Sequence, residues 1–236
     1  VFISYEVSRG HFTEKDQLVF SGNPVRPDFF DLDRQKAREV LGIGEDIFLV
    51  LVMGGSLGAR TLNTAVSRMD DQGDWSDLLA RQPQLRMSVS VGVQSQAGCA
   101  EAISELPGIL RAESFFLDAP SWIAACDLFI GRAGAMTCAE IAAQAKPSIL
   151  IPFPFAADDH QTENARAMEE AGAALVIKDG DFDSHSLLTS IESMMEDPDR
   201  LALMGQKAGQ WATPKAADRI AEGIAAAMTD HETPKP

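Results

Sequence analysis

The sequence predicts an α/β fold built on a doubly wound, Rossmann-like parallel sheet. Apolar runs of strand length alternate with segments of helical period along most of the 236 residues, a pattern typical of a parallel sheet covered on both faces. The segments between the runs have the lengths of β-α-β connections. Glycine-rich stretches follow two of the runs, and the carboxyl edge of such a sheet is where ligands bind.

Six strands are expected, because each apolar run has the length of a strand and ends at turn or helix-start residues. They are Ile47–Met53, Leu85–Val91, Ser114–Leu117, Asp127–Ile130, Ser148–Ile151 and Ala174–Ile177. Helical periodicity resumes after each strand. Helices are expected to begin near Gly58, Ser95, Pro120, Gly134 and Gln161, with two or three more after Ser184.

The chain divides into four predicted segments. Prolines within Gly22–Asp33 disfavour a helix and a central strand, so residues 21–33 are expected to be a linker. Residues 34–213 form the expected main domain, and residues 214–236 a C-terminal helix with a frayed polar tail. The first residue is Val1 and no signal peptide follows it, so residues 1–20 are expected to be the tail of a preceding domain in a longer chain.

Charge and cysteine content narrow the class of protein. The net charge is −15, from 20 Lys and Arg against 35 Asp and Glu, which disfavours nucleic acid and anionic membranes as partners. An anionic ligand therefore needs a locally positive site. Cys99, Cys126 and Cys138 are odd in number and show no CxxC spacing, which suits reduced thiols in the cytoplasm. No apolar run is long enough to span a bilayer.

The first candidate motif is Met53–Arg60, which lies between the most apolar strand and a helix. Its glycines allow the backbone to approach a ligand closely, and the helix start offers unpaired N–H groups to a phosphate. The motif is neither GxGxxG nor a Walker loop, so a tight strand-to-helix turn without a ligand is the alternative.

The second candidate motif is Gly131–Glu140, again after a strand and at the start of a helix. Thr137 and Glu140 are three residues apart and share a helix face, so a hydroxyl and a carboxylate point to the same side. A carboxylate there can accept both hydroxyls of a ribose. The alternative is a solvated Glu140 beside core residues Met136 and Cys138.

The third candidate motif is Ile151–Ala165, in which prolines end a strand and a polar loop leads into a helix. Gln161 and Asn164 lie three apart, and their amides suit sugar hydroxyls because an amide both donates and accepts. His160 could act as a base or ligand, but no other histidine has ligand spacing to it, and a loop histidine is the alternative.

No metal or cofactor is expected. Asp-x-Asp pairs occur at 31/33, 179/181, 181/183 and 197/199, but several are expected by chance in so acidic a chain. None of these pairs directly follows an apolar strand.

Four motifs taken together resemble glycosyltransferase family 28, in the order that this family shows. They are Gly22–Arg26 (GNPVR), Gly54–Arg60 (GGSLGAR) with Leu62 and Asn63, Arg132–Glu140 (RAGAMTCAE) and Pro152–Ala165 (PFPFAADDHQTENA). The resemblance is close from Phe20 to about Ile177 and looser beyond. It is closest to the MurG-type transferases of this family, which add N-acetylglucosamine to a lipid-linked muramyl-pentapeptide in peptidoglycan synthesis.

The resemblance implies one half of a two-domain enzyme of the GT-B type, with the active site between two Rossmann-like domains. Residues 34–213 would be the C-terminal domain that binds UDP-N-acetylglucosamine, and residues 1–20 the end of the acceptor domain. The general base would belong to the acceptor half, so this sequence contains no residue that we name as catalytic. The lipid-linked acceptor would bind through that half, and this chain alone is expected to be inactive. The intact enzyme would act at the cytoplasmic face of the inner membrane, with no membrane contact from this half.

The resemblance also implies donor contacts. Arg26 and Ser56 would meet the diphosphate, the backbone around Phe116 and Leu117 the uracil edge, and Glu140 the ribose. Gln161 and Asn164 would hold the N-acetylglucosamine hydroxyls. The remaining contacts near the nucleotide would come from Ala135, Met136 and Thr137.

Two alternatives to the donor-binding half of a peptidoglycan transferase remain open. One is a non-catalytic UDP-sugar-binding subunit of a split glycosyltransferase. The other is a relative that uses another UDP-sugar or lipid acceptor, because Ser90–Gly92 (SVG) stands where the family often has Gln-Thr/Ser-Gly.

Overall fold

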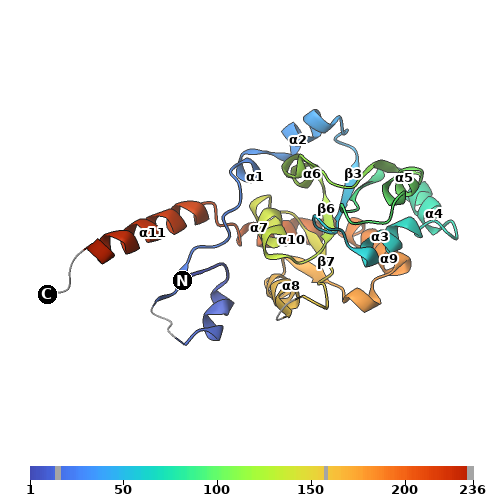
Figure 1. Cartoon of the computed structure of the whole chain (residues 1–236). Coiled ribbons are helices and arrows are strands. Elements are labelled where there is room, and N and C mark those ends of the chain that lie inside the picture. The colour runs from blue at the N-terminus through green and yellow to red at the C-terminus, as the bar shows by residue number, and fades with distance from the viewer. Residues whose placement is uncertain (14–16, 157–158, 233–236) are drawn as a thin grey trace.

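The computed structural model describes residues 1–13, 17–156 and 159–232 (Figure 1). Its centre is a six-stranded sheet in the order β5-β4-β3-β6-β7-β8, with every strand parallel to its neighbours. The strands are β3 (Phe48–Met53), β4 (Leu85–Ser90), β5 (Ile109–Glu113), β6 (Leu128–Gly131), β7 (Ser148–Leu150) and β8 (Ala174–Val176). The strand order reverses between β3 and β6, which confirms the doubly wound fold.

Helices cover both faces of the sheet (Figure 1). One buried cluster contains residues from α3 (Arg60–Ser67), α4 (Asp74–Arg81), α5 (Cys99–Ser104) and α9 (Ser184–Met195). The other contains residues from α2 (Arg34–Leu41), α6 (Ala119–Ala125), α7 (Ala135–Ala143) and α8 (His160–Glu170). α10 (Pro198–Gly209) contributes Met204 to the first cluster and Ala208 to the second.

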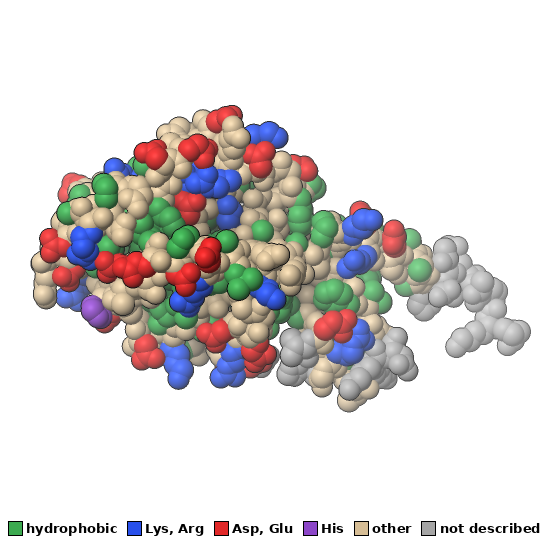
Figure 2. Space-filling view, turned by 180° about the vertical axis from the view of Figure 1, so that it is seen from behind, with side chains coloured by type: hydrophobic (Ala, Val, Ile, Leu, Met, Phe, Trp, Pro, Cys, Tyr) green, Lys and Arg blue, Asp and Glu red, His purple; other side chains and the backbone are tan. Residues whose placement is uncertain are grey.

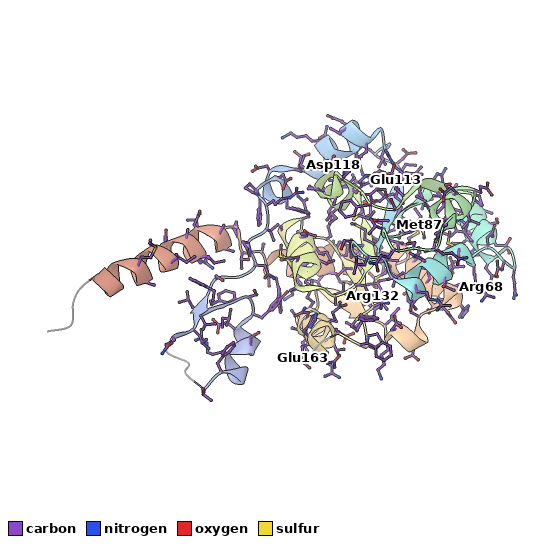
Figure 3. The ribbon with its side chains drawn as sticks, in the orientation of Figure 1. Arg68, Met87, Glu113, Asp118, Arg132 and Glu163 are labelled. Carbon is purple, nitrogen blue, oxygen red and sulfur yellow. The ribbon has the colours of Figure 1, made fainter. Side chains whose placement is uncertain are left out.

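The central strand β3 shows why the sheet is buried on both faces. Val50 and Val52 join the first cluster, whereas Leu49 and Leu51 join the second. Successive side chains of a strand point to opposite faces, so an uninterrupted apolar run supplies both cores. Met87 of the neighbouring strand lies inside the molecule in Figure 3, whereas Arg68 and Glu163 lie at its surface.

The predicted strand at Ser114–Leu117 is wrong: the edge strand is β5, which ends at Glu113. β5 lies at the edge of the sheet and carries exposed polar side chains, so its apolar signal is weak. The stronger signal after it comes from Phe116, which is buried in a loop and stacks on Trp122 with ring centroids 4.7 Å apart. The other five predicted strands are confirmed within one or two residues.

The predicted helix starts near Gly58, Ser95, Pro120, Gly134 and Gln161 are confirmed within four residues, and three helices follow Asp183. The sequence patterns did not predict α2 or α4. The predicted linker contains a helical turn, α1 (Asp28–Asp31), which begins directly after Pro27. Proline fixes φ near the helical value, so a proline at a helix start favours the turn that follows.

The first and last segments lie beside the main sheet. β1 (Phe2–Ile3) and β2 (Val19–Phe20) form a separate two-stranded parallel sheet, with a 3-10 helix, η1 (Glu6–His11), after β1. α11 (Ala216–Glu232) extends away from the sheet (Figure 1). The predicted frayed tail lies mostly beyond the described residues. Within the described residues, no helix is both long and apolar enough to cross a membrane.

A buried ion pair joins α2 to the amino ends of the central strands. The guanidinium of Arg38, which is 0% exposed, lies 2.6 Å from Asp127 Oδ2 and also donates to the backbone oxygens of Ala125, Gly44 and Ile47. The same carboxylate oxygen accepts the N–H of Leu49 at 2.7 Å. Acidic and basic side chains on the face seen in Figure 2 are interspersed at the surface, unlike this pair.

Asp127→Ala is expected to lower the free energy of unfolding by ~3–5 kcal/mol, because it leaves the Arg38 charge buried without a counter-ion. Urea denaturation followed by circular dichroism measures the loss. Arg81→Ala, which breaks an exposed pair with Glu192, is the matched control and should change little. Equal effects of the two substitutions would contradict the assignment.

Candidate functional site

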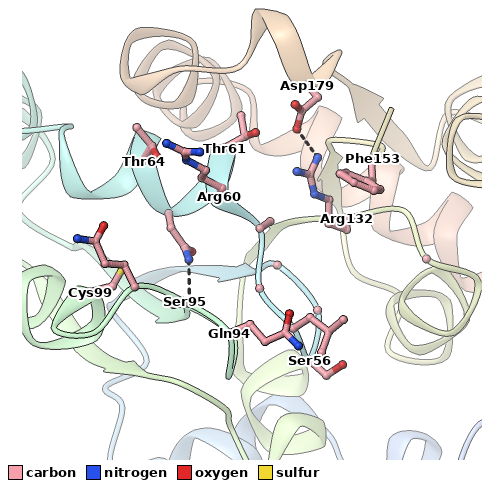
Figure 4. A pocket seen from close by; sticks show the side chains of 18 of the residues that line it. Ser56, Arg60, Thr61, Thr64, Gln94, Ser95, Cys99, Arg132, Phe153 and Asp179 are labelled. Carbon is pink, nitrogen blue, oxygen red and sulfur yellow. Dashed lines mark hydrogen bonds and ion pairs between the residues drawn. The ribbon is translucent and has the colours of Figure 1, made fainter. Parts of the chain in front are cut away.

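A cleft of about 1100 Å³ opens at the carboxyl ends of the central strands. Its walls come from the turn between β3 and α3, the loop after β4, the start of α7 and the loop after β7. In Figure 4, Arg60, Thr61 and Thr64 of α3 lie on one side of the cleft and Arg132, Phe153 and Asp179 on the other. The cleft lies beside the point where the strand order reverses, which is the place where ligands bind in this fold.

The turn after β3 packs directly on the loop after β4. Gly58 and Gly92 have φ angles of +97° and +89°, and a side chain on either would collide with the backbone of the other loop. Two backbone hydrogen bonds join the loops: Val93 N–H to Ser56 O at 3.0 Å and Gln94 N–H to Leu57 O at 3.2 Å. Glycines are therefore required at both positions. The close backbone approach that was predicted for a ligand occurs here between two loops of the protein.

The buried amide of Asn63 stabilises the same junction between the two loops. Asn63 Nδ2 donates to Val91 O at 2.8 Å and lies 3.2 Å from Ser95 Oγ. Val91 itself is a core residue. The Val91 side chain is therefore part of the core, and neither Ser90 nor Val91 is among the residues that line the cleft.

Arg132 organises the opposite wall. Its side chain is largely buried, and Nη1 lies 2.5 Å from Asp179 Oδ1 and 3.1 Å from Ile151 O. The guanidinium also lies over the Phe153 ring, 5.4 Å from its centroid. Asp179 belongs to the 179/181 Asp-x-Asp pair of the sequence, and in the structure it accepts a hydrogen bond from an arginine.

Gln161 extends this wall with an oriented amide. Its Oε1 accepts the N–H of Phe153 at 3.0 Å. This contact fixes the plane of the amide, and Gln161 lines the cleft. Asn164 is buried instead, and its Nδ2 donates to Ala133 O at 3.0 Å in the turn before α7.

The first turn of α7 forms the cleft edge between Gly134 and Thr137, both of which line it. Gly134 occupies the N-cap position and provides no side-chain cap. The N–H groups at a helix start lack partners within the helix and carry partial positive charge. Met136 is 43% exposed beside them. This turn therefore offers donors at the cleft without a competing side chain.

Arg26 and Glu140 lie close enough to interact electrostatically. The Arg26 guanidinium lies 3.3 Å from Asp28 and over the ring of Phe29. Burial raises the pKa of Glu140 to about 7, against the attraction of Arg26, which lowers this pKa. A carboxyl with this pKa changes charge near neutral pH.

Phe116 and Leu117 differ sharply in exposure. Phe116 is buried, whereas Leu117 is 91% exposed. Within the part of the chain that the structure describes, the backbone groups of these two residues make no hydrogen bond to the backbone. Neither residue lines the cleft.

The predicted site residues therefore fall into three positions. Ser56, Thr137 and Gln161 line the cleft. Four others lie on α7 and α8 but outside the lining of the cleft: Ala135, Met136, Glu140 and Asn164. The remaining three, Arg26, Phe116 and Leu117, lie on neighbouring segments. The sequence motifs did not predict a site role for six other residues that line the cleft: Arg60, Thr61, Thr64, Gln94, Arg132 and Asp179. Arg60 and Arg132 lie inside the motifs, and this position is the sequence signal that could have identified them as site residues. No group of three His, Cys, Asp or Glu that could hold a metal occurs among residues 1–13, 17–156 and 159–232.

The fold and the cleft define a class: an α/β domain that binds its ligand at the carboxyl edge of a doubly wound sheet. A family model described as the glycosyltransferase family 28 C-terminal domain matches residues 49–220. The chain belongs to glycosyltransferase family 28.

Two curated relatives carry the same name, UDP-N-acetylglucosamine–N-acetylmuramyl-(pentapeptide) pyrophosphoryl-undecaprenol N-acetylglucosamine transferase. The one from Desulfitobacterium hafniense is 37% identical over 93% of this chain and 59% of its own length. The one from Myxococcus xanthus is 37% identical over 94% of this chain and 55% of its own. The chain thus spans less than two thirds of these relatives.

A solved structure shares the fold. The crystal structure of Acinetobacter baumannii MurG has a TM-score of 0.66 and 26% sequence identity, over 88% of this chain and 57% of that chain.

Gly92→Ala is expected to lower the free energy of unfolding by ~2 kcal/mol more than Gly98→Ala does. Both glycines have positive φ, but a Cβ at Gly92 would collide with Gly58, whereas one at Gly98 meets open space. Guanidinium denaturation of the two variants measures the difference. Equal losses would show that the two loops can separate at no cost.

Proposed function

We propose that this chain is the donor-binding half of an inverting, metal-independent glycosyltransferase. The reaction moves N-acetylglucosamine from UDP-N-acetylglucosamine to a lipid-linked muramyl-pentapeptide, which converts lipid I to lipid II in peptidoglycan synthesis. The observation that carries the proposal is the cleft at the carboxyl edge, because residues of three motifs of this family line it. The names of the relatives supply the reaction.

The diphosphate of the donor would lie at the starts of α3 and α7, beside Ser56. Helix starts stabilise anions through their free N–H groups and dipole. The exposed guanidinium of Arg26, which lies 3.3 Å from Asp28, would add positive charge at the site. In a chain of net charge −15 such local donors are what an anionic ligand requires.

The nucleoside and the sugar would occupy opposite ends of the site. The uracil edge would bond backbone groups around Phe116 and Leu117, and the Glu140 carboxylate would accept ribose hydroxyls. Gln161 would donate its Nε2 hydrogens to the N-acetylglucosamine. Asn164 would act indirectly, because its hydrogen bond to Ala133 O holds the turn before α7.

The chemistry divides between two halves in this proposal. Inversion needs a base that deprotonates the acceptor oxygen, and that group would belong to the acceptor half. The donor half stabilises the negative charge that develops on the departing UDP, through Arg26 and the two helix starts.

The same proposal assigns residues 34–213 to the donor domain, 21–33 to the linker and 1–20 to the end of the acceptor domain. The intact enzyme would act at the cytoplasmic face of the inner membrane, with the lipid-linked acceptor bound through the other half.

Calorimetric titration of this chain with UDP-N-acetylglucosamine in excess EDTA tests the proposal. Saturable binding that survives chelation, and that exceeds the binding of UDP-N-acetylgalactosamine, is expected. The sugars differ only in the orientation of one hydroxyl, so this comparison isolates the sugar end of the site. Absence of binding in a sample shown to be folded by circular dichroism would refute the proposal.

The affinity for UDP is expected to fall about tenfold between pH 8 and pH 6. With a pKa of about 7, Glu140 is charged at pH 8 and largely protonated at pH 6, and only the carboxylate accepts two ribose hydroxyls. Titrations of UDP at both pH values measure the change.

Glu140→Gln is the control for this pH dependence. Its amide does not titrate, so whatever change in affinity remains in the variant comes from the phosphates of UDP itself. The difference between the two proteins belongs to Glu140. Identical pH profiles in both proteins would exclude Glu140 from the ribose site.

A further inference from the structure

The carbonyl of Ala135, the first residue of α7, accepts two hydrogen bonds from side chains far away in the sequence. Asn23 Nδ2 donates at 3.0 Å and the Tyr5 hydroxyl at 3.2 Å. The helix itself needs only one donor at this carbonyl, the N–H four residues later. The first turn of α7 is therefore held from outside the helix, by the segment that precedes the main domain.

Asn23 is itself held in one orientation. Ser4 Oγ donates to Asn23 Oδ1 at 2.6 Å, so the amide oxygen is engaged and Nδ2 points to Ala135. Gly22 precedes it with a φ of +80° and lies against the side chain of Thr213, where a Cβ would collide. Only glycine meets both conditions. The Gly22–Asn23 pair of the first family motif thus has a defined structural role.

Tyr5 is a permanent donor at this position. Burial raises the pKa of the Tyr5 hydroxyl well above its ordinary value, so the proton stays on the oxygen. The ring contacts Trp211, with centroids 5.9 Å apart. The hydroxyl is therefore fixed by packing as well as by its hydrogen bond.

These contacts act on the cleft through one turn of helix. Gly134 and Thr137 line the cleft on either side of Ala135, and no side chain caps the helix start. The peptide unit is rigid, so a donor that fixes the Ala135 carbonyl also fixes the direction of the Met136 N–H in the same unit. The rest of α7 is held by its buried residues Cys138, Ile141 and Ala142 and does not depend on this contact.

We propose that Asn23 and Tyr5 are positioning residues that aim the N–H groups at the start of α7 toward the phosphates of a nucleoside diphosphate. The inference rests on the proposed function, because it requires the diphosphate to lie at this helix start. Neither side chain lines the cleft, so they act through α7 rather than on the ligand.

Tyr5→Phe and Asn23→Ala in this chain test the inference. Each variant removes one hydrogen bond to Ala135, and each is expected to weaken UDP binding about two- to tenfold. Binding of uridine, which lacks the phosphates, should stay unchanged in both variants. A general loss of folded structure would weaken uridine binding as well, so the UDP-to-uridine ratio separates positioning from stability. Calorimetry measures UDP, and ligand-observed NMR titration measures uridine.

Ser184→Ala is the matched control, because Ser184 Oγ also donates to a helix carbonyl, Ala65 O, at 3.0 Å. It should lower the melting temperature without changing either affinity. Unchanged UDP affinity in folded Tyr5→Phe and Asn23→Ala proteins would overturn the positioning role while wild-type binding upheld the donor site. Failure of the wild-type chain to bind UDP would overturn both.

Discussion

The cleft depends on one close contact, in which the backbone at Gly58 touches the backbone at Gly92. Parallel strands end at a common edge, and without this contact the turns after β3 and β4 would stand apart there. The contact sets the position of Ser56 on one side and of the loop after β4 on the other. The glycines therefore shape the wall of the site, and a ligand would meet the surface that their packing leaves. This differs from a loop whose glycines serve only to admit a phosphate.

Several buried or half-buried charges in this acidic chain are paired with opposite charges within the protein. Arg38 meets Asp127 at the amino ends of the strands, and Arg132 meets Asp179 at the carboxyl ends. A paired arginine holds segments together and has little charge left to offer a ligand. The starts of α3 and α7, by contrast, have no side-chain cap. The proposed anion site accordingly depends more on helix geometry than on the number of basic residues.

Local patterns predicted the parts of the structure that depend on local forces. β3 was predictable because its apolar run supplies two cores at once, and α7 because a glycine precedes a run of helix-forming residues. β5 was not predictable, because an edge strand needs fewer apolar side chains. The buried Phe116 in the following loop gives an apolar signal that resembles a strand. The helical turn after Pro27 was hidden by the same prolines that indicated a linker.

The candidate site shows the same division. The motifs identified the segments that reach the carboxyl edge, and Ser56, Thr137 and Gln161 do line the cleft. The partners of these segments lie far away in the sequence. Asn23 and Ala135 are 112 residues apart, and Arg132 and Asp179 are 47 apart. Hydrogen bonds over such separations follow from the packing of whole elements, so no local pattern contains them.

The amide of Gln161 is divided between two tasks. One lone pair of its oxygen accepts the backbone N–H of Phe153, which fixes the plane of the amide. A side chain that could otherwise rotate about its last bond therefore presents its two N–H bonds in a fixed direction. A hydroxyl in front of these bonds would accept from them, and its own proton would need another acceptor. The loop after β7 thus sets the direction of the donors without having to touch a ligand itself.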